Sequence, residues 1–152
     1  MISKKIATLL IFFLINTQLA YANYGFYNKV ANTCKHYRVP VDKKKMFLTE
    51  TKDGYHFTIE LQSRRTNFEM VMLVGFISIG QAIKHQEYFA KKKKSYKAIS
   101  PKNTYVTVLY PSGRNVSSIS AMATNEQVIK LAEGKVDTAG FMRLIKNSIQ
   151  TL

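Results

Sequence analysis

The residues best suited to chemistry are lysines and aromatic residues gathered within ten positions in the second half of the chain. The set comprises Tyr88, Phe89, Lys91, Lys92, Lys93, Lys94, Tyr96 and Lys97. Aromatic rings settle at the headgroup level of a membrane interface, and lysines meet its negative charge. The set therefore predicts contact with an anionic surface such as a lipid or an envelope polymer. The plainer alternative is a solvated loop that only ends a helix.

Two motif-like features lack what catalysis requires. Residues 75–82 place two glycines at the spacing of a phosphate-binding loop, but Gln81 stands where that loop carries its lysine and Ala82 where it carries a hydroxyl. Ser78 lacks the glycine that a nucleophile elbow has two residues earlier, because Phe76 stands there. The sequence therefore predicts neither nucleotide binding nor a catalytic serine, and its small residues here favour helix packing.

The titratable residues do not form a recognisable site either. His36, His56 and His85 are scattered, with no pair at the spacing of a zinc site. Glu50 and Glu60 fall on opposite faces of a predicted hairpin and so do not form a carboxylate pair. We expect no catalytic, cofactor-binding or metal-binding residues. A hydrolase is retained only as an alternative whose residues would have to converge from distant parts of the chain.

The N-terminal 22 residues have the pattern of a secretory signal peptide. Lys4 and Lys5 precede an apolar run over 6–15, and Ala20 and Ala22 supply the small side chains of a cleavage site between Ala22 and Asn23. The apolar run is shorter than the roughly 20 residues of a membrane-spanning helix. We therefore expect a periplasmic or secreted mature protein, residues 23–152.

Charge and cysteine content narrow the class of partner. Of the 23 basic residues, two leave with the signal peptide, so 21 face 9 acidic ones and the mature chain carries about +12. Lysine dominates this excess, which suits diffuse attraction to an anionic surface better than shaped anion recognition. Cys34 is the only cysteine, so no intramolecular disulfide forms. We expect it to be buried, with an intermolecular bridge as the alternative.

The clearest local pattern is a first hairpin. Alternation of apolar and polar residues over 55–62 predicts a half-buried strand, and Asp53-Gly54 predicts a two-residue turn before it. This turn would pair Leu48 with Ile59 and Met46 with Leu61. The apolar side chains of both strands then share one face.

A long helix is predicted over 66–89, beginning near Thr66 or Asn67. Residues 70–83 carry no charge, so this helix must be covered on several sides or meet a partner. Gly75, Ser78, Gly80 and Ala82 would allow a sheet or another helix to approach its backbone closely.

The flanking segments complete the prediction. A short helix ends before Pro40, a short strand covers 96–99, and a second hairpin joins 104–110 to 115–121. A capping box of Thr124 and Gln127 starts a helix that ends at Gly134. Asp137 caps a last helix with one apolar stripe, formed by Phe141, Leu144, Ile145, Ser148, Ile149 and Leu152.

These elements predict one α+β domain over 23–152, an antiparallel sheet of two hairpins packed against a long apolar central helix and two C-terminal helices. Residues 23–44 are expected to be poorly ordered or a short helix. We expect an exported binding or envelope-accessory module with a protein partner in the envelope. Anionic lipid or polymer is a further candidate ligand, homo-oligomerisation stays open, and nucleic acid is disfavoured. An inhibitor or immunity-type protein of an exported enzyme is the main alternative.

Overall fold

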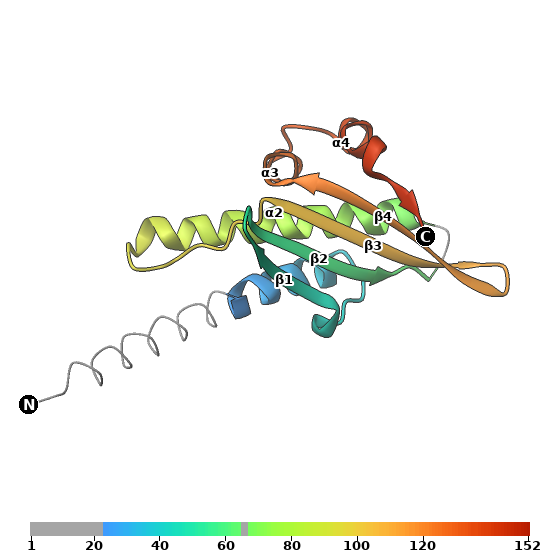
Figure 1. Ribbon diagram of the computed structural model, residues 1–152, viewed down its shortest axis with the longest axis horizontal. Coiled ribbons are helices and arrows are strands. Elements are labelled where there is room, and N and C mark those ends of the chain that lie inside the picture. The colour runs from blue at the N-terminus through green and yellow to red at the C-terminus, as the bar shows by residue number, and fades with distance from the viewer. Residues whose placement is uncertain (1–22, 65–66) are drawn as a thin grey trace, which may run out of the picture.

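The computed structural model describes residues 23–64 and 67–152, so the predicted signal peptide lies outside the described residues (Figure 1). The described chain forms an α+β fold, which confirms the predicted class. Its elements are a helix over 23–36, the 3-10 turn η1 Lys43–Lys45, β1 Met46–Thr51, β2 Gly54–Gln62, α2 Phe68–Lys92, β3 Asn103–Ser112, β4 Asn115–Thr124, α3 Asn125–Ala132, α4 Thr138–Ile145, η2 Lys146–Ser148 and β5 Gln150–Thr151.

The five strands form one mixed sheet in the order β1-β2-β3-β4-β5. Both predicted hairpins, β1–β2 and β3–β4, are present and antiparallel, but β2 and β3 run parallel. The reason is α2, which carries the chain back along the sheet before β3 begins, as a parallel connection requires. Figure 1 shows α2 crossing one face of the sheet, with α3 and α4 beside the β4 edge.

The first hairpin has a different register from the predicted one. Met46 pairs with Ile59 and Leu48 with Phe57, a shift of two residues. A two-residue shift leaves the alternation of faces intact. The predicted apolar face is therefore confirmed, and Phe57, Ile59 and Leu61 of β2 are buried.

The shift arises at the turn, which consists of Lys52 and Asp53 instead of Asp53 and Gly54. The Thr51 hydroxyl accepts a hydrogen bond from the Asp53 N–H at 3.3 Å and donates one to the Gly54 carbonyl at 2.9 Å. Gly54 then opens β2 at a φ of 118°, where a side chain would be strained. Gly54 has the expected positive φ, but it follows the two turn residues instead of being the second of them.

The predicted central helix is confirmed as α2, which has Asn67 as its N-cap and continues to Lys92. Neighbours surround it on several sides through the small residues singled out in the sequence. A Cβ at Gly75 would lie 2.8 Å from Val106 of β3, and a Cβ at Gly80 would lie 2.3 Å from the Val128 carbonyl oxygen of α3. These glycines therefore set how closely the sheet and α3 approach α2.

Two further contacts of α2 come from opposite ends of the chain. The Phe76 ring packs against Phe141 of α4, with centroids 5.2 Å apart. On another side, the fully buried Cys34 thiol of the helix over 23–36 donates to the Ser78 hydroxyl at 3.2 Å. Cys34 is thus buried, as predicted. Residues 23–36 form a helix that packs against α2.

Two predicted elements in the second half are wrong. Residues 96–99 form no strand; Ile99 is buried and its N–H donates to the Gln86 side chain instead. The last helix does not run to the C-terminus but ends at Ile145, and the fifth strand is β5. The cause is the free edge of β4, where the Ser148 hydroxyl accepts from the Met122 N–H at 3.0 Å and the tail then pairs with the strand.

The predicted capping box, the glycine that ends its helix and the cap of the last helix are all confirmed. The Thr124 side chain accepts from the Gln127 N–H, and the Gln127 side chain accepts from the Thr124 N–H. Gly134 follows α3 at a φ of 69°. The Asp137 carboxylate accepts from the Gly140 N–H at 2.6 Å and begins α4.

The packing of α2 on α3 predicts a large effect of Gly80→Ala. The added methyl would collide with the Val128 carbonyl and with Ala132, so we expect a loss of at least about 2 kcal/mol in unfolding free energy. Gly25→Ala is the matched helical control, because its Cβ would make only an ordinary contact of 3.6 Å with Gln86. It should gain up to about 1 kcal/mol. Denaturant titration measures both, and equal effects would contradict this account of the packing.

Candidate functional site

The eight residues of the predicted anionic-surface site lie together at the C-terminal end of α2. We call this set, Tyr88, Phe89, Lys91–Lys94, Tyr96 and Lys97, the aromatic–lysine cluster. None of residues 87–92 is buried, so the last turns of α2 extend beyond the core. The first two lysines belong to the last turn of α2, the third is its C-cap, and Lys94 begins the following turn.

The aromatic side chains of the cluster contact one another although two of them are largely exposed. The Phe89 ring lies 5.7 Å from Tyr88 and 5.8 Å from Tyr96, centroid to centroid, and 4.8 Å from His85. Tyr88 and Phe89 are nevertheless 51% and 40% exposed. Exposed contiguous aromatic surface is a common mark of an interaction site. The sequence placed these rings close in the chain, and the structure places them in contact.

The turn that carries the last lysines is fastened to the helix. The Lys93 N–H donates to the Phe89 carbonyl and the Tyr96 N–H donates to the Lys93 carbonyl, both at 2.9 Å. The fully buried Gln86 side chain then accepts from the Ile99 N–H at 3.1 Å. The Tyr96 hydroxyl approaches the helix over 23–36 near Gly25. This turn is therefore held in place at several points.

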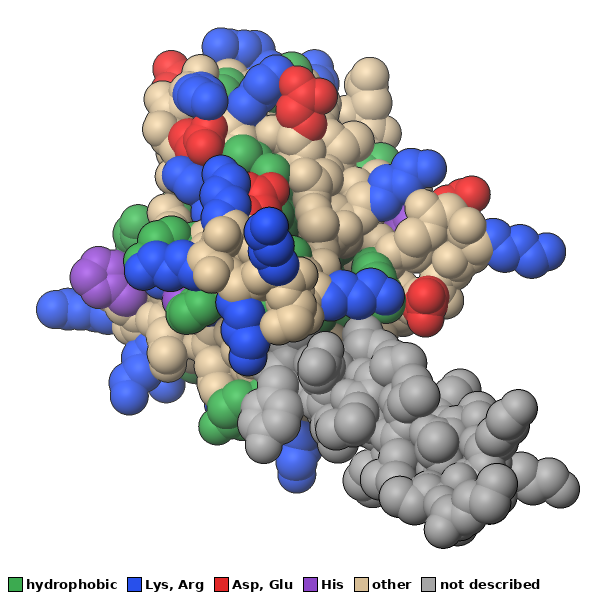
Figure 2. Space-filling model, turned by 90° about the vertical axis from the view of Figure 1, so that its left-hand side faces the viewer, with side chains coloured by type: hydrophobic (Ala, Val, Ile, Leu, Met, Phe, Trp, Pro, Cys, Tyr) green, Lys and Arg blue, Asp and Glu red, His purple; other side chains and the backbone are tan. Residues whose placement is uncertain are grey.

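The charge of the cluster is uncompensated. Salt bridges among the described residues join Lys45 to Glu60, Lys130 to Glu126, and both Lys84 and Lys135 to Glu133; none includes a lysine of the cluster. Lys92 instead lies over the Tyr88 ring, 4.4 Å from its centroid. Figure 2 shows this end of the molecule, where lysine and arginine side chains far outnumber acidic ones around small hydrophobic areas. The helix dipole also favours cations here.

His85 contributes a ring to this region without contributing charge. Burial, and after it the positive charge of Lys29, lowers the pKa of His85 below its usual value. Its Nδ1 atom is buried and has no hydrogen bond among the described residues. Burial and the neighbouring lysine therefore outweigh the helix dipole, which would favour the charged imidazole.

The other chemical candidates are dispersed. His56 lies on the open face of the sheet, 6.3 Å from Tyr105 ring to ring, and His36 stacks edge-on with Tyr37. Ser78 is fully buried and donates to the Val74 carbonyl at 2.7 Å, so its hydroxyl serves α2. Within residues 23–64 and 67–152, no three histidine, cysteine or acidic side chains are grouped as a metal would require.

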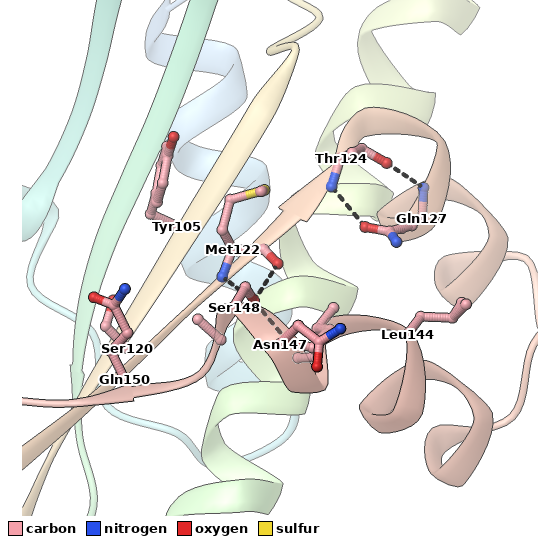
Figure 3. Close-up of a pocket in the computed structure, with 11 residues that line it drawn as sticks. Tyr105, Ser120, Met122, Thr124, Gln127, Leu144, Asn147, Ser148 and Gln150 are labelled. Atoms are coloured by element: carbon pink, nitrogen blue, oxygen red, sulfur yellow. Dashed lines mark hydrogen bonds between the residues drawn. The ribbon is translucent and has the colours of Figure 1, made fainter.

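Sequence reasoning missed a cavity of about 530 Å³ at the C-terminal edge of the sheet. It is lined by Tyr105, Ser120, Ala121, Met122, Thr124, Gln127, Leu144, Ile145, Asn147, Ser148 and Gln150. Figure 3 shows Met122 and Ser148 in its centre, with Tyr105 and Gln150 on one side and Gln127 and Leu144 on the other. The lining residues come from six elements, so no local motif signals them. The only trace is the run of polar and half-buried residues on the strand face that turns away from α2.

Comparisons of the chain with models of protein families, with curated proteins and with solved structures found no match. None of the helices in the described ranges combines the length and apolarity that a membrane crossing needs.

The surroundings of His85 predict its titration. We expect its imidazole to titrate below pH 6.5, and Lys29→Met to raise this pKa because one of the two causes of the shift is removed. Because the unfolded state then binds the proton first, the free energy of unfolding should fall as pH drops below about 6.5. NMR titration of the ring protons measures the pKa. Lys52→Met, in the turn of the first hairpin, should leave it unchanged; an equal shift in both variants would contradict this assignment.

Proposed function

We propose that the protein is an exported binding module of the cell envelope that docks on an anionic surface through the aromatic–lysine cluster. The observation that carries this proposal is the combination of unpaired lysines and exposed, mutually packed aromatic rings on one anchored helix end. Rings of this kind partition into an interface, and lysines add roughly 1 kcal/mol each near an anionic lipid surface.

The anchoring of the cluster supports binding over a purely structural role. A run of lysines that only ended a helix would require no fixed turn behind it. Here the buried Gln86 holds the Ile99 backbone, and Tyr96 packs on Phe89. Side chains and backbone that are fixed before binding lose less conformational entropy when the ligand arrives.

The location rests on the sequence of the first 22 residues. Phe26, Val30 and Cys34 are fully buried core residues, and cleavage after Ala22 would leave all three in the mature chain. We expect the protein isolated from its own cells to begin at Asn23. N-terminal sequencing and intact-mass measurement of the envelope fraction test this. A chain that begins at Met1 in the cytosol would contradict export and return intracellular anions as ligands.

Removal of charge from the cluster should weaken surface binding strongly. For the triple variant Lys92→Ala, Lys93→Ala, Lys94→Ala, we expect binding to vesicles of phosphatidylglycerol and phosphatidylcholine to fall about 100-fold, at roughly 1 kcal/mol per lysine. At high salt, screening removes most of the lysine contribution and leaves that of the aromatic rings, so Phe89→Ser should weaken the binding that remains. The chain has no tryptophan to serve as a fluorescent probe, so vesicle co-sedimentation and calorimetry measure these affinities.

The matched control removes three positive charges elsewhere. Lys35, Lys52 and Lys146 are exposed and form no salt bridge in the described part of the chain. Their replacement by alanine should weaken binding less than about tenfold, because charges more than a Debye length from the surface are screened. Equal losses in the two triple variants would show that net charge alone drives binding, and vesicles of phosphatidylcholine alone should bind neither protein.

A further inference from the structure

The cavity beside β4 differs chemically from the rest of this cationic protein, because no charged side chain lines it. Three other cavities formed by described residues each have basic side chains in their walls: Lys35, Arg38 and Lys43 in one, Lys29 in the second, and Arg38 with Arg64 in the third. A wall without charge, in a chain of net charge +14, offers an ionised ligand no countercharge and so favours a neutral one. The volume of this cavity, about 530 Å³, falls in the range of small-molecule sites.

Several polar groups of this cavity have no hydrogen-bond partner in the described part of the chain. The Tyr105 hydroxyl and the side-chain amides of Asn147 and Gln150 make no hydrogen bond among the described residues. The Gln127 amide uses its oxygen to accept from the Thr124 N–H, so its NH₂ group remains as a donor. Primary amides and a phenol offer donors and acceptors side by side, which is the pattern that hydroxyl groups match.

Apolar surface lies between these polar groups. The Met122 side chain and the half-buried Tyr105 ring face the cavity from the strands, and Leu144, 53% exposed, faces it from α4. A ligand that presents both hydroxyl groups and C–H faces would satisfy the two kinds of surface together. A sugar ring has this character.

The backbone groups around the cavity already form hydrogen bonds within the protein, which disfavours a peptide as the ligand. The Ser148 hydroxyl accepts from the Met122 N–H at 3.0 Å and lies 2.8 Å from the Met122 carbonyl oxygen, and the Leu152 N–H donates to the Ser118 carbonyl at 3.0 Å. A peptide that added a strand to β4 would need these groups free. The same bonds fix η2 against β4 and so preform the cavity.

From these observations we propose that the cavity binds one or two rings of an uncharged carbohydrate, with Tyr105, Asn147 and Gln150 as its principal polar contacts. This site is separate from the aromatic–lysine cluster, and it uses neither charge nor exposed lysine. Its binding is therefore insensitive to salt, whereas binding of the cluster to anionic vesicles is not.

The test is a titration of the protein, purified from cells that express the full chain, with maltotriose, cellotriose and chitotriose, followed by NMR. We expect at least one sugar to produce saturable shifts confined to residues that line the cavity, unchanged between about 50 and about 500 mM NaCl. Tyr105→Ala should weaken binding at least about tenfold, since it removes the ring and the hydroxyl. Asn147→Ala, on an exposed residue, should weaken it about three- to tenfold.

If Tyr105→Ala does not fold, the effect of Asn147→Ala on sugar binding tests the proposal by itself. The triple lysine variant of the cluster serves as the control and should bind the sugar as the unchanged protein does, so that failure of one proposal is distinguishable from failure of the other. The proposal is overturned if none of the sugars shifts the cavity residues, if neither variant weakens binding, or if an uncharged acetylated tripeptide binds there and the sugars do not.

Discussion

The close approach of neighbours to α2 is the constraint on which the rest of the fold depends. The sheet meets this helix at Gly75, α3 meets it at Gly80, and the N-terminal helix reaches it through the Cys34–Ser78 hydrogen bond. Each contact exists because the residue on α2 is small. A helix with larger side chains at these positions would hold the same elements apart and leave voids between them.

This arrangement also decides where binding surfaces are available. α2 is enclosed along most of its length, and its last turns, beyond Gln86, extend out of the core. The aromatic–lysine cluster occupies that protruding end. On the opposite side of the sheet no helix of the described residues covers the strands, and the uncharged cavity forms where β4 lacks a full-length neighbour. The two proposed sites thus occupy places that the packing of α2 leaves open.

Sequence periodicity succeeded where structure is local and failed where distant segments decide. The alternation over 55–62 identified β2, and the Thr124–Gln127 pair identified the start of α3, because both signals lie within a few residues. The parallel pairing of β2 with β3 depends on the path of α2, which no local pattern encodes. The end of α4 depends on Ser148 meeting Met122 across 26 positions. An apolar stripe that continued past Ile145 was therefore mistaken for helix.

The same distinction separates the two sites. The eight residues of the cluster fall within ten positions, so their types and spacing were sufficient to single them out. The cavity draws its wall from strands, helices and the C-terminal tail, and it emerges only once Tyr105 and Gln150 are brought together. The wall of the cavity lacks charge only once these residues are assembled, and the basic composition of the whole chain does not predict it.

The single parallel pair in this sheet has a consequence for the order of folding. Each hairpin needs only a short turn to form, whereas joining β2 to β3 closes a loop of about 40 residues that contains α2. The entropic cost of that closure is recovered only when α2 lies on both strands. The two hairpins are therefore the local part of this topology, and the docking of the long helix that joins them is its non-local and entropically costly part.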